Sequence, residues 1–225
     1  MYSDTPKGKD PDAYSPTLRR YHKHLWSKKL PNGRDLNLSD TKPGSYLYHN
    51  SGLGEFFLSS DAITHSYKTT KSISHVIAEL PSDQVDSLFN KGSTIGAYII
   101  FPAKKIDGKM TINGARGLSR QIKDRFDLTL ECIRLHYVGL SNPLEDVLHR
   151  YRDFFNLFTD FRGYVDYFLL QDLVSGDYNE VKFYLPFDDF KNSPLPDTRD
   201  RYLRYRENTI AFIDARNHRI LSASN

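Results

Sequence analysis

The side chains best suited to chemistry lie around the start of a predicted long helix. In the segment Asn113-Gly-Ala-Arg-Gly117, an arginine stands between two glycines, directly before the apolar residue Leu118. Glycine permits close approach of the backbone to a ligand, and the free N–H groups of a helix start attract anions. Arg116, Arg120 and Lys109 would supply positive charge at the same place. These three residues are therefore predicted to bind phosphate, with Arg116 at an anion site rather than in a structural salt bridge.

This motif differs from the well-known phosphate-binding loops. It lacks the Lys-Ser/Thr pair that follows the second glycine of a Walker A loop, and it does not match GxGxxG. A plain turn before a helix, with its arginines solvated or paired to Asp124 and Asp127, accounts for the same residues. Both interpretations stay open on the residues alone.

Charged side chains also recur along the predicted helices that follow. Opposite charges three or four residues apart usually form local surface pairs. Convergence of several carboxylates would instead hold a divalent metal ion for phosphodiester chemistry, in which the ion polarises phosphate and activates water. The mutual distances of the carboxylates decide between the two, and the residues concerned are Asp124, Glu131, Asp160 and Asp166. Asp124 and Glu131 are catalytic candidates on this basis.

His22 is the third catalytic candidate. It stands beside Tyr21 and Trp26, and this setting predicts a residue of a cleft. His22 and His24 are two residues apart, which would bring them together on a strand but not on the helix that the neighbouring periodicity favours, so no metal site is predicted. Cys132 is expected to be a buried, inert thiol. No motif identifies a cofactor.

Hydrophobic spacing and turn residues predict the elements that position these side chains. Helices are expected over 17–26, 72–80, 82–89, 118–137, 142–158 and 164–174, and again after residue 197. Strands are expected over 46–49, 55–58, 94–101, 106–112 and 181–187. The first two strands form a hairpin, and 94–101 pairs with 106–112 across an Asp-Gly turn. Asn142 is expected to cap its helix.

These elements predict an α+β fold that is predominantly helical, with a small β-sheet. The 225 residues, 39% of them hydrophobic, suit a single globular domain over 17–225, preceded by a flexible lead-in over 1–16. The sheet is expected to contain Thr94–Phe101 and Val181–Leu185. The composition excludes disorder.

Net charge and cysteine content limit the cellular compartments and the classes of partner that are expected. A net charge of +3 is weak support for a polyanionic partner. One cysteine excludes internal disulfides and multi-cysteine metal clusters, and with no signal peptide it favours the cytoplasm. No stretch is apolar enough to span a membrane, so no membrane association is expected.

Several longer strings in the sequence resemble an uncharacterised bacterial family, a domain of unknown function. They include the passage from Ile106 to Gly117, the passage from Asp124 to Arg134, and Phe161-Arg-Gly-Tyr-Val-Asp-Tyr-Phe-Leu-Leu-Gln-Asp-Leu-Val174. The similarity runs from about Asp10 to Ile220. It implies no reaction, cofactor or catalytic residue.

Two classes of function fit these observations. In the first, the protein binds nucleic acid or a phosphorylated ligand through Lys109, Arg116 and Arg120, with aromatic stacking by Tyr21 or Trp26 and with metal-dependent cleavage of phosphodiesters as an extension. In the alternative, it is a non-enzymatic interaction module that presents exposed tyrosines and arginines to a protein partner. Whether the protein is an enzyme is left open by the sequence.

Overall fold

The computed structural model describes residues 14–223 and has the predicted fold class, a mainly helical α+β fold with small sheets. The α-helices are α2 (Pro16–Trp26), α3 (Ser74–Ala78), α4 (Ser82–Lys91), α5 (Ile112–Leu118), α6 (Phe126–Tyr137), α7 (Glu145–Arg150), α8 (Arg152–Phe155), α9 (Phe161–Tyr167) and α10 (Arg199–Ala223). Short 3-10 helices are η1 (Lys71–Ile73), η2 (Ile95–Ala97), η3 (Asn156–Phe158) and η4 (Gln171–Leu173). The strands are β1 (Lys28–Lys29), β2 (Asp35–Leu36), β3 (Leu47–Ser51), β4 (Gly54–Ala62) and β5 (Tyr98–Pro102).

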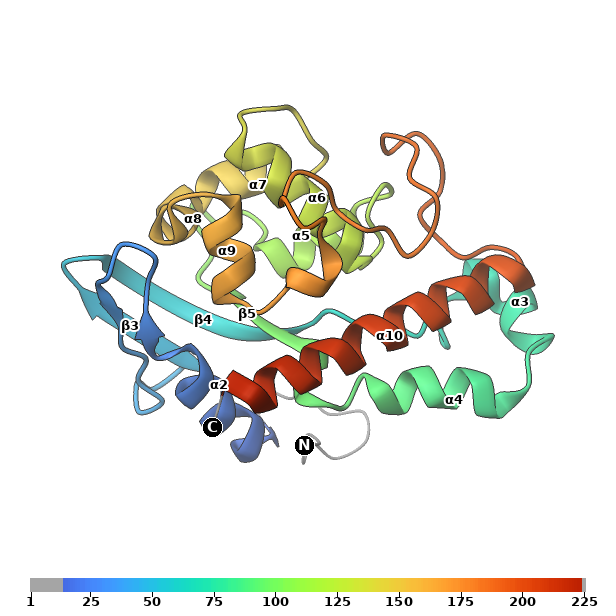
Figure 1. The fold of residues 1–225 in the computed structure, drawn as a ribbon, viewed down its shortest axis with the longest axis horizontal. Coiled ribbons are helices and arrows are strands. Elements are labelled where there is room, and N and C mark those ends of the chain that lie inside the picture. Colours follow the sequence, from blue (N-terminus) through green and yellow to red (C-terminus); the bar gives the residue numbers. More distant parts are fainter. Residues whose placement is uncertain (1–13, 224–225) are drawn as a thin grey trace.

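The larger sheet has three antiparallel strands in the order β3-β4-β5 (Figure 1). The predicted hairpin is confirmed, because β3 pairs with β4 in a register that places Leu47 opposite Leu58. The β5 strand is completely buried and pairs with the other edge of β4. The expected partner of this strand, 106–112, forms turns instead, and α5 begins at Ile112.

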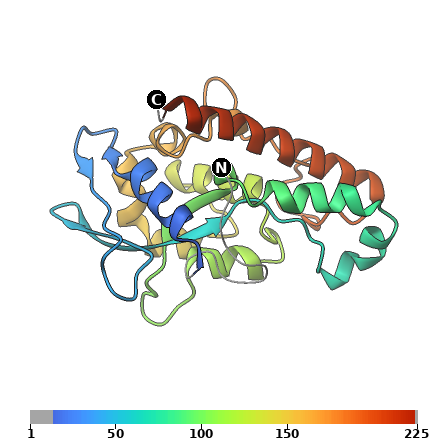
Figure 2. The ribbon, with the colours of Figure 1, turned by 90° about the horizontal axis from the view of Figure 1, so that it is seen from below.

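Helices gather around this sheet in two groups. In Figure 1, α5 to α9 lie above the sheet, whereas α4 and α10 run side by side below it, and Figure 2 shows the same pair from below. Between the groups lies a core dense in aromatic rings. Its centre joins Trp26 to the α9 region, because the Tyr167 ring stacks on Trp26 at 6.0 Å and the Phe168 ring lies tilted against it at 5.1 Å between centroids. The α9 segment is therefore central, and its helix ends at Tyr167, short of the predicted end at residue 174.

The first described helix shows how local signals set a boundary. Ser15 accepts a hydrogen bond from the backbone N–H of Leu18, and Pro16 occupies the first helical position. The cap is thus Ser15, and the helix begins at Pro16, one residue before the predicted start at 17. The Pro31-Asn-Gly33 turn follows this helix, with Gly33 in the left-handed region at φ +80°. Of the predicted lead-in over 1–16, residues 1–13 lie outside the described part of the chain.

The predicted helix over 118–137 is wrong in its first half. Leu118 ends α5 and is 67% exposed, and α6 begins only at Phe126. Between the two helices, Lys123 and Asp124 adopt positive φ angles of 45° and 62°, which no helix contains. Ile122 lies in this connection and its side chain is buried there. It therefore matches the helical spacing of apolar residues although it is not in a helix.

The predicted strand over 181–187 is also wrong. Val181 forms an isolated bridge with Val174, and the chain beyond it is irregular. A side chain replaces the missing ladder, because the Asp127 carboxylate accepts the backbone N–H of Tyr184 at 2.9 Å. The β-prone composition of this segment reflects burial rather than sheet pairing.

The long C-terminal helix α10 buries a face different from the one that aliphatic spacing predicts. Leu203, Ile210, Ile213 and Leu221 recur at roughly helical spacing, but only Ile213 is fully buried, and Leu221 is 54% exposed. The buried face consists of Tyr202, Tyr205, Thr209, Phe212, Ile213, Arg216 and Ile220. Aromatic rings and an arginine therefore share this buried face with two isoleucines.

Arg216 joins three parts of the fold. Its guanidinium is fully buried and donates to the carbonyls of Gly96 at 2.7 Å, Tyr98 at 2.8 Å and Phe168 at 3.0 Å. Burial lowers the pKa of Arg216 to about 10. The contacts fasten α10 to β5 and to the end of α9.

Candidate functional site

Arg116 is not a solvated residue at an anion site, which corrects the prediction from the sequence. Its side chain is fully buried and forms an ion pair with Asp61 of β4. The guanidinium also donates to the hydroxyl of Thr129 at 2.9 Å. The two glycines that were expected to form a loop lie within α5, where Gly114 and Gly117 allow the helix to approach its neighbours. Arg116 is therefore a structural residue.

Asp124 lies beside this ion pair. The Arg116 guanidinium reaches the Asp124 carbonyl at 3.4 Å, and an added Cβ on Gly117 would lie 3.3 Å from the Asp124 carboxylate. Burial raises the pKa of Asp61, against the lowering effect of Arg116, and the charge of Asp124 raises it further. Burial lowers the pKa of the nearby His65, although the Asp124 charge acts in the opposite direction. These residues form a half-buried charged cluster.

The four carboxylates whose mutual distances decide between local pairs and a metal site do not converge. Glu131 forms a double hydrogen bond with Arg134 at 2.8 and 2.7 Å, and Asp160 caps α9 by accepting the N–H of Gly163 at 2.7 Å. Asp166 accepts hydrogen bonds from Gln171 and Tyr178. Within residues 14–223, no group of three or more His, Cys, Asp or Glu side chains is arranged to hold a metal ion.

His22 is a core residue and does not line a cleft. It is fully buried, its Nδ1 lies 3.1 Å from the Tyr46 hydroxyl, and burial lowers its pKa to about 3, helped by the charge of Arg216. Trp26 is equally buried, so it cannot stack on a nucleic-acid base. Cys132 is buried as expected, and burial raises the pKa of its thiol.

The expected display of exposed tyrosines is wrong as well. Among the described residues, Tyr14 is the only tyrosine with a strongly exposed ring. Many of the others are buried, namely Tyr46, Tyr67, Tyr98, Tyr151, Tyr164, Tyr167, Tyr184, Tyr202 and Tyr205. The premise of a tyrosine-rich protein interface therefore fails in this part of the chain.

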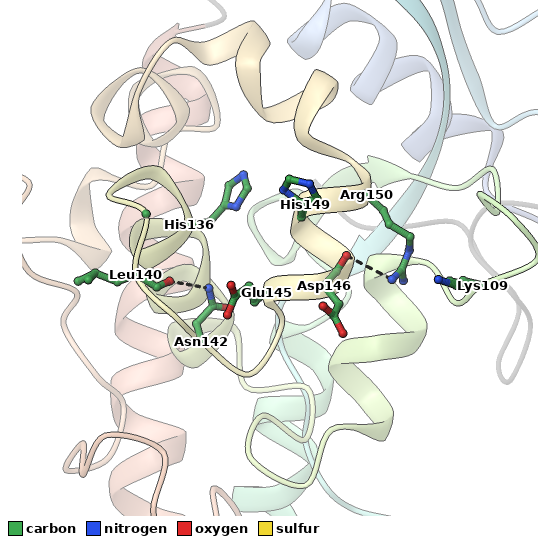
Figure 3. A pocket seen from close by; sticks show the side chains of 9 residues that line it. Lys109, His136, Leu140, Asn142, Glu145, Asp146, His149 and Arg150 are labelled. Carbon is green, nitrogen blue, oxygen red and sulfur yellow. Dashed lines mark hydrogen bonds between the residues drawn. The ribbon is translucent and has the colours of Figure 1, made fainter.

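A cavity of about 590 Å³ lies between the end of α6, the start of α7 and the loop before α5 (Figure 3). Its volume is in the range typical of small-ligand sites. The lining residues are Lys109, His136, Gly139, Leu140, Asn142, Glu145, Asp146, His149 and Arg150. Of the three residues predicted to bind phosphate, Lys109 lines this cavity. Arg120 is exposed on the turn after α5 and does not belong to the lining.

Two cations mark one end of the cavity. Figure 3 shows Lys109 and Arg150 next to each other, although they come from different segments. Arg150 is held in place by the backbone carbonyls of Asp146 at 3.2 Å and Met110 at 2.9 Å. Carbonyl oxygens orient the guanidinium without neutralising it, so its positive charge stays available to a ligand. Lys109 is exposed and forms no ion pair with any residue in 14–223.

Two imidazoles lie along one wall of the cavity, His136 near the end of α6 and His149 near the end of α7. The ring of His136 packs against Phe155 at 5.4 Å between centroids. Burial lowers the pKa of His136, the charge of His149 lowers it further, and Glu145 acts in the opposite direction. His136 is therefore mainly neutral at pH 7.

The remaining polar side chains of the cavity can accept hydrogen bonds. Glu145 accepts a hydrogen bond from Ser141 at 2.8 Å. Asn142 accepts the N–H of Leu144 at 3.0 Å in the turn before α7. The prediction that it caps the helix is wrong, because α7 begins at Glu145 and its N-cap residue is Leu144. Figure 3 shows Asn142 and Glu145 away from Lys109. The cavity thus offers cations at one end and acceptors toward the other.

The two histidines and Arg150 were not predicted as site residues from the sequence. A usable signal exists, since two helices joined by a short connection, here 138–144, pack against each other. Polar residues that flank such a connection are then close in space. His136 stands two residues before this connection and His149 five residues after it.

No helix within the described residues is long and apolar enough to cross a membrane. Neither the curated proteins nor the solved structures contain a match to this chain. The family described as "Family of unknown function (DUF6994)" matches residues 1–220. This match covers nearly the whole chain and agrees with the resemblance drawn from its motifs, so the chain belongs to the family of unknown function DUF6994.

Proposed function

We propose that the protein binds phosphate groups of nucleic acid or of a smaller phosphorylated ligand in the cavity between α6, α7 and the loop before α5. The observation that carries the proposal is the pairing of Lys109 with Arg150 at one end of this cavity. A guanidinium held by carbonyls and a free ammonium form the charge-assisted hydrogen bonds that phosphate oxygens accept. The site replaces the one predicted at Arg116.

The rest of the lining suits the remainder of a nucleotide. Glu145 and Asn142 can accept hydrogen bonds from ribose hydroxyls or base amino groups. The two carboxylates of the lining, Glu145 and Asp146, offset the two cations, so the wall is not uniformly positive. A ligand with an anionic end and a donor-rich end matches this distribution better than a simple polyanion does.

Binding to a labelled single-stranded oligonucleotide and to inorganic phosphate, measured across a salt series, tests the proposal. Affinity for the oligonucleotide is expected to fall as salt rises, because bound phosphates release counterions. Lys109→Ala and Arg150→Ala should each weaken binding at least about tenfold, since a hydrogen bond to a charged group contributes about 1.5–3 kcal/mol.

Two exposed residues outside the cavity provide matched controls. Lys105→Ala and Arg204→Ala remove the same charges from the surface and should leave binding unchanged. If the cavity variants and the control variants weakened binding equally, the ligand would be attracted by the general positive charge of the surface. That result would refute the proposed binding site. A wild-type protein that binds neither probe would overturn the function and favour the interaction module.

A further inference from the structure

We infer that Lys28 is a modification site, at which the side-chain amine is acylated by small acyl phosphates. The inference goes beyond the proposed function, because Lys28 lies outside the cavity described above. Lys28 belongs to β1, and its side chain reaches the end of α9, where Nζ donates to the backbone carbonyl of Tyr167 at 2.6 Å. The site is therefore formed by segments that only the fold brings together.

The amine of Lys28 lies against two aromatic rings. Its Nζ is 5.0 Å from the centre of the Trp26 ring and 4.6 Å from the centre of the Tyr167 ring. Both rings are buried, whereas Lys28 itself is half-buried and can be reached by a small reagent. The rings and the carbonyl replace water around the amine, but they carry no full negative charge to balance an ammonium.

A second cation faces the same tryptophan. The Arg216 guanidinium lies 5.9 Å from the centre of the Trp26 ring. Among the described residues no carboxylate forms an ion pair with Lys28, whereas the neighbouring Lys29 pairs with Asp35 at 3.4 Å. Burial, followed by the charge of Arg216, lowers the pKa of Lys28 to about 8. A desolvated lysine near another cation is the setting that makes an amine nucleophilic.

Acylation replaces the ammonium of this site by a neutral amide. The Nζ lone pair attacks the acyl carbon, and the N–C bond forms. The bond from that carbon to the phosphate oxygen breaks, and inorganic phosphate leaves with the proton that the amine loses. The product suits its surroundings, because the amide keeps an N–H for the Tyr167 carbonyl and no longer places a charge near Arg216.

The fraction of neutral amine sets the size of the expected effect. At pH 7 about a tenth of an amine with a pKa of about 8 is neutral and able to react. For an ordinary lysine, with a pKa of about 10.4, the neutral fraction is about one part in 2,500. Lower basicity and partial burial of Lys28 offset part of this advantage, so we expect acylation at least about fivefold faster than at an ordinary exposed lysine.

Brief treatment of the folded protein with acetyl phosphate at pH 7 tests the inference, with each site quantified by tandem mass spectrometry. Lys29 is the matched control, because it is adjacent in the chain and its side chain is 72% exposed. Lys28 should be acetylated at least about fivefold faster than Lys29. Any smaller preference would overturn the inference.

The same measurement in concentrated urea assigns the reactivity to the fold. The preference for Lys28 over Lys29 should disappear there, because burial and the nearby charge of Arg216 are lost. A preference that persists in urea would come from the local sequence and would refute the role of the folded site. Acetyl-coenzyme A, a bulkier donor of the same group, should prefer Lys28 less than acetyl phosphate does. Equal preference with both donors would overturn the restriction to small acyl phosphates.

The pH dependence in the folded protein gives an independent readout. The acetylation rate of Lys28 should rise with pH and level off about one unit above its pKa of about 8. An ordinary lysine continues to gain neutral amine up to a pH of about 10.4 and beyond. A rate at Lys28 that still rises steeply at that pH would show an ordinary ammonium and would refute the inference.

Discussion

The buried ion pair between Arg116 and Asp61 provides the most direct test of how this fold is held together. Asp61→Ala removes the carboxylate and leaves a guanidinium that is 0% exposed. Breaking a buried pair by deleting one partner typically destabilises a protein by about 3–5 kcal/mol, because the remaining charge is buried without compensation. The free energy of unfolding of a typical domain is about 5–15 kcal/mol. The loss expected for Asp61→Ala is therefore a large fraction of the protein's stability.

The surroundings of Arg116 determine where in the range of about 3–5 kcal/mol the loss of stability is expected to fall. Its other hydrogen bonds go to the Thr129 hydroxyl and the Asp124 carbonyl, and neither acceptor carries a formal charge. The rings of Phe101 and Phe126 face the guanidinium at 6.0 and 5.7 Å, which offers partial compensation. The Asp124 carboxylate is also near enough to raise the pKa of Asp61. We therefore expect the lower end of the range, about 3 kcal/mol.

Urea unfolding followed by circular dichroism measures this loss. The double variant Asp61→Leu, Arg116→Met removes both charges and should recover much of the stability, because no buried charge is then left unpaired. The exposed pair of Lys29 and Asp35, 3.4 Å apart with side chains 72% and 58% exposed, supplies the control. Asp35→Ala should cost less than about 1 kcal/mol. An Asp61→Ala change as small as this control, or a double variant as unstable as the sum of its parts, would refute the reasoning.

Three further changes should affect stability in ways that urea or thermal unfolding can measure. Gly163→Ala should destabilise by about 1–3 kcal/mol, because the added Cβ would lie 2.1 Å from the Phe158 carbonyl oxygen, whereas Gly176→Ala meets no atom within 4 Å and should change little. Asn142→Ala should cost about 1 kcal/mol by removing the acceptor at the start of its turn, and an unchanged midpoint would contradict that role. His22 has a pKa lowered from 6.5 to about 3 by burial, so the unfolded chain binds a proton that the folded one does not, and below pH 6.5 its contribution to stability should fall by about 1.4 kcal/mol per pH unit. His22→Gln should flatten this dependence between pH 6.5 and 4, and a slope as steep as in the wild type would exclude His22 as its source.

The sequence alone determined the features that depend on near neighbours in the chain. The β3–β4 hairpin follows from two β-prone runs around Asn50-Ser-Gly52, and α2 follows from its apolar spacing. Turn chemistry and periodicity act over a few residues, so one sequence is enough to predict them.

Tertiary structure decided which polar residues are buried and which meet. An arginine between two glycines reads as a ligand-binding residue until Asp61, far away in the chain, is found beside it. The same holds for α10, whose buried face of tyrosines and Arg216 is defined by the carbonyls of Gly96 and Phe168. Local patterns carry no information about partners so distant.

The cavity illustrates the same division. Lys109 could be singled out from the sequence for its charge, but its partner Arg150 is brought to it by the packing of α7 against the loop before α5. His136 and His149 become neighbours only because the chain reverses direction between their helices. Charge and residue type are properties of the sequence, whereas convergence on one site depends on long-range packing that no local pattern encodes.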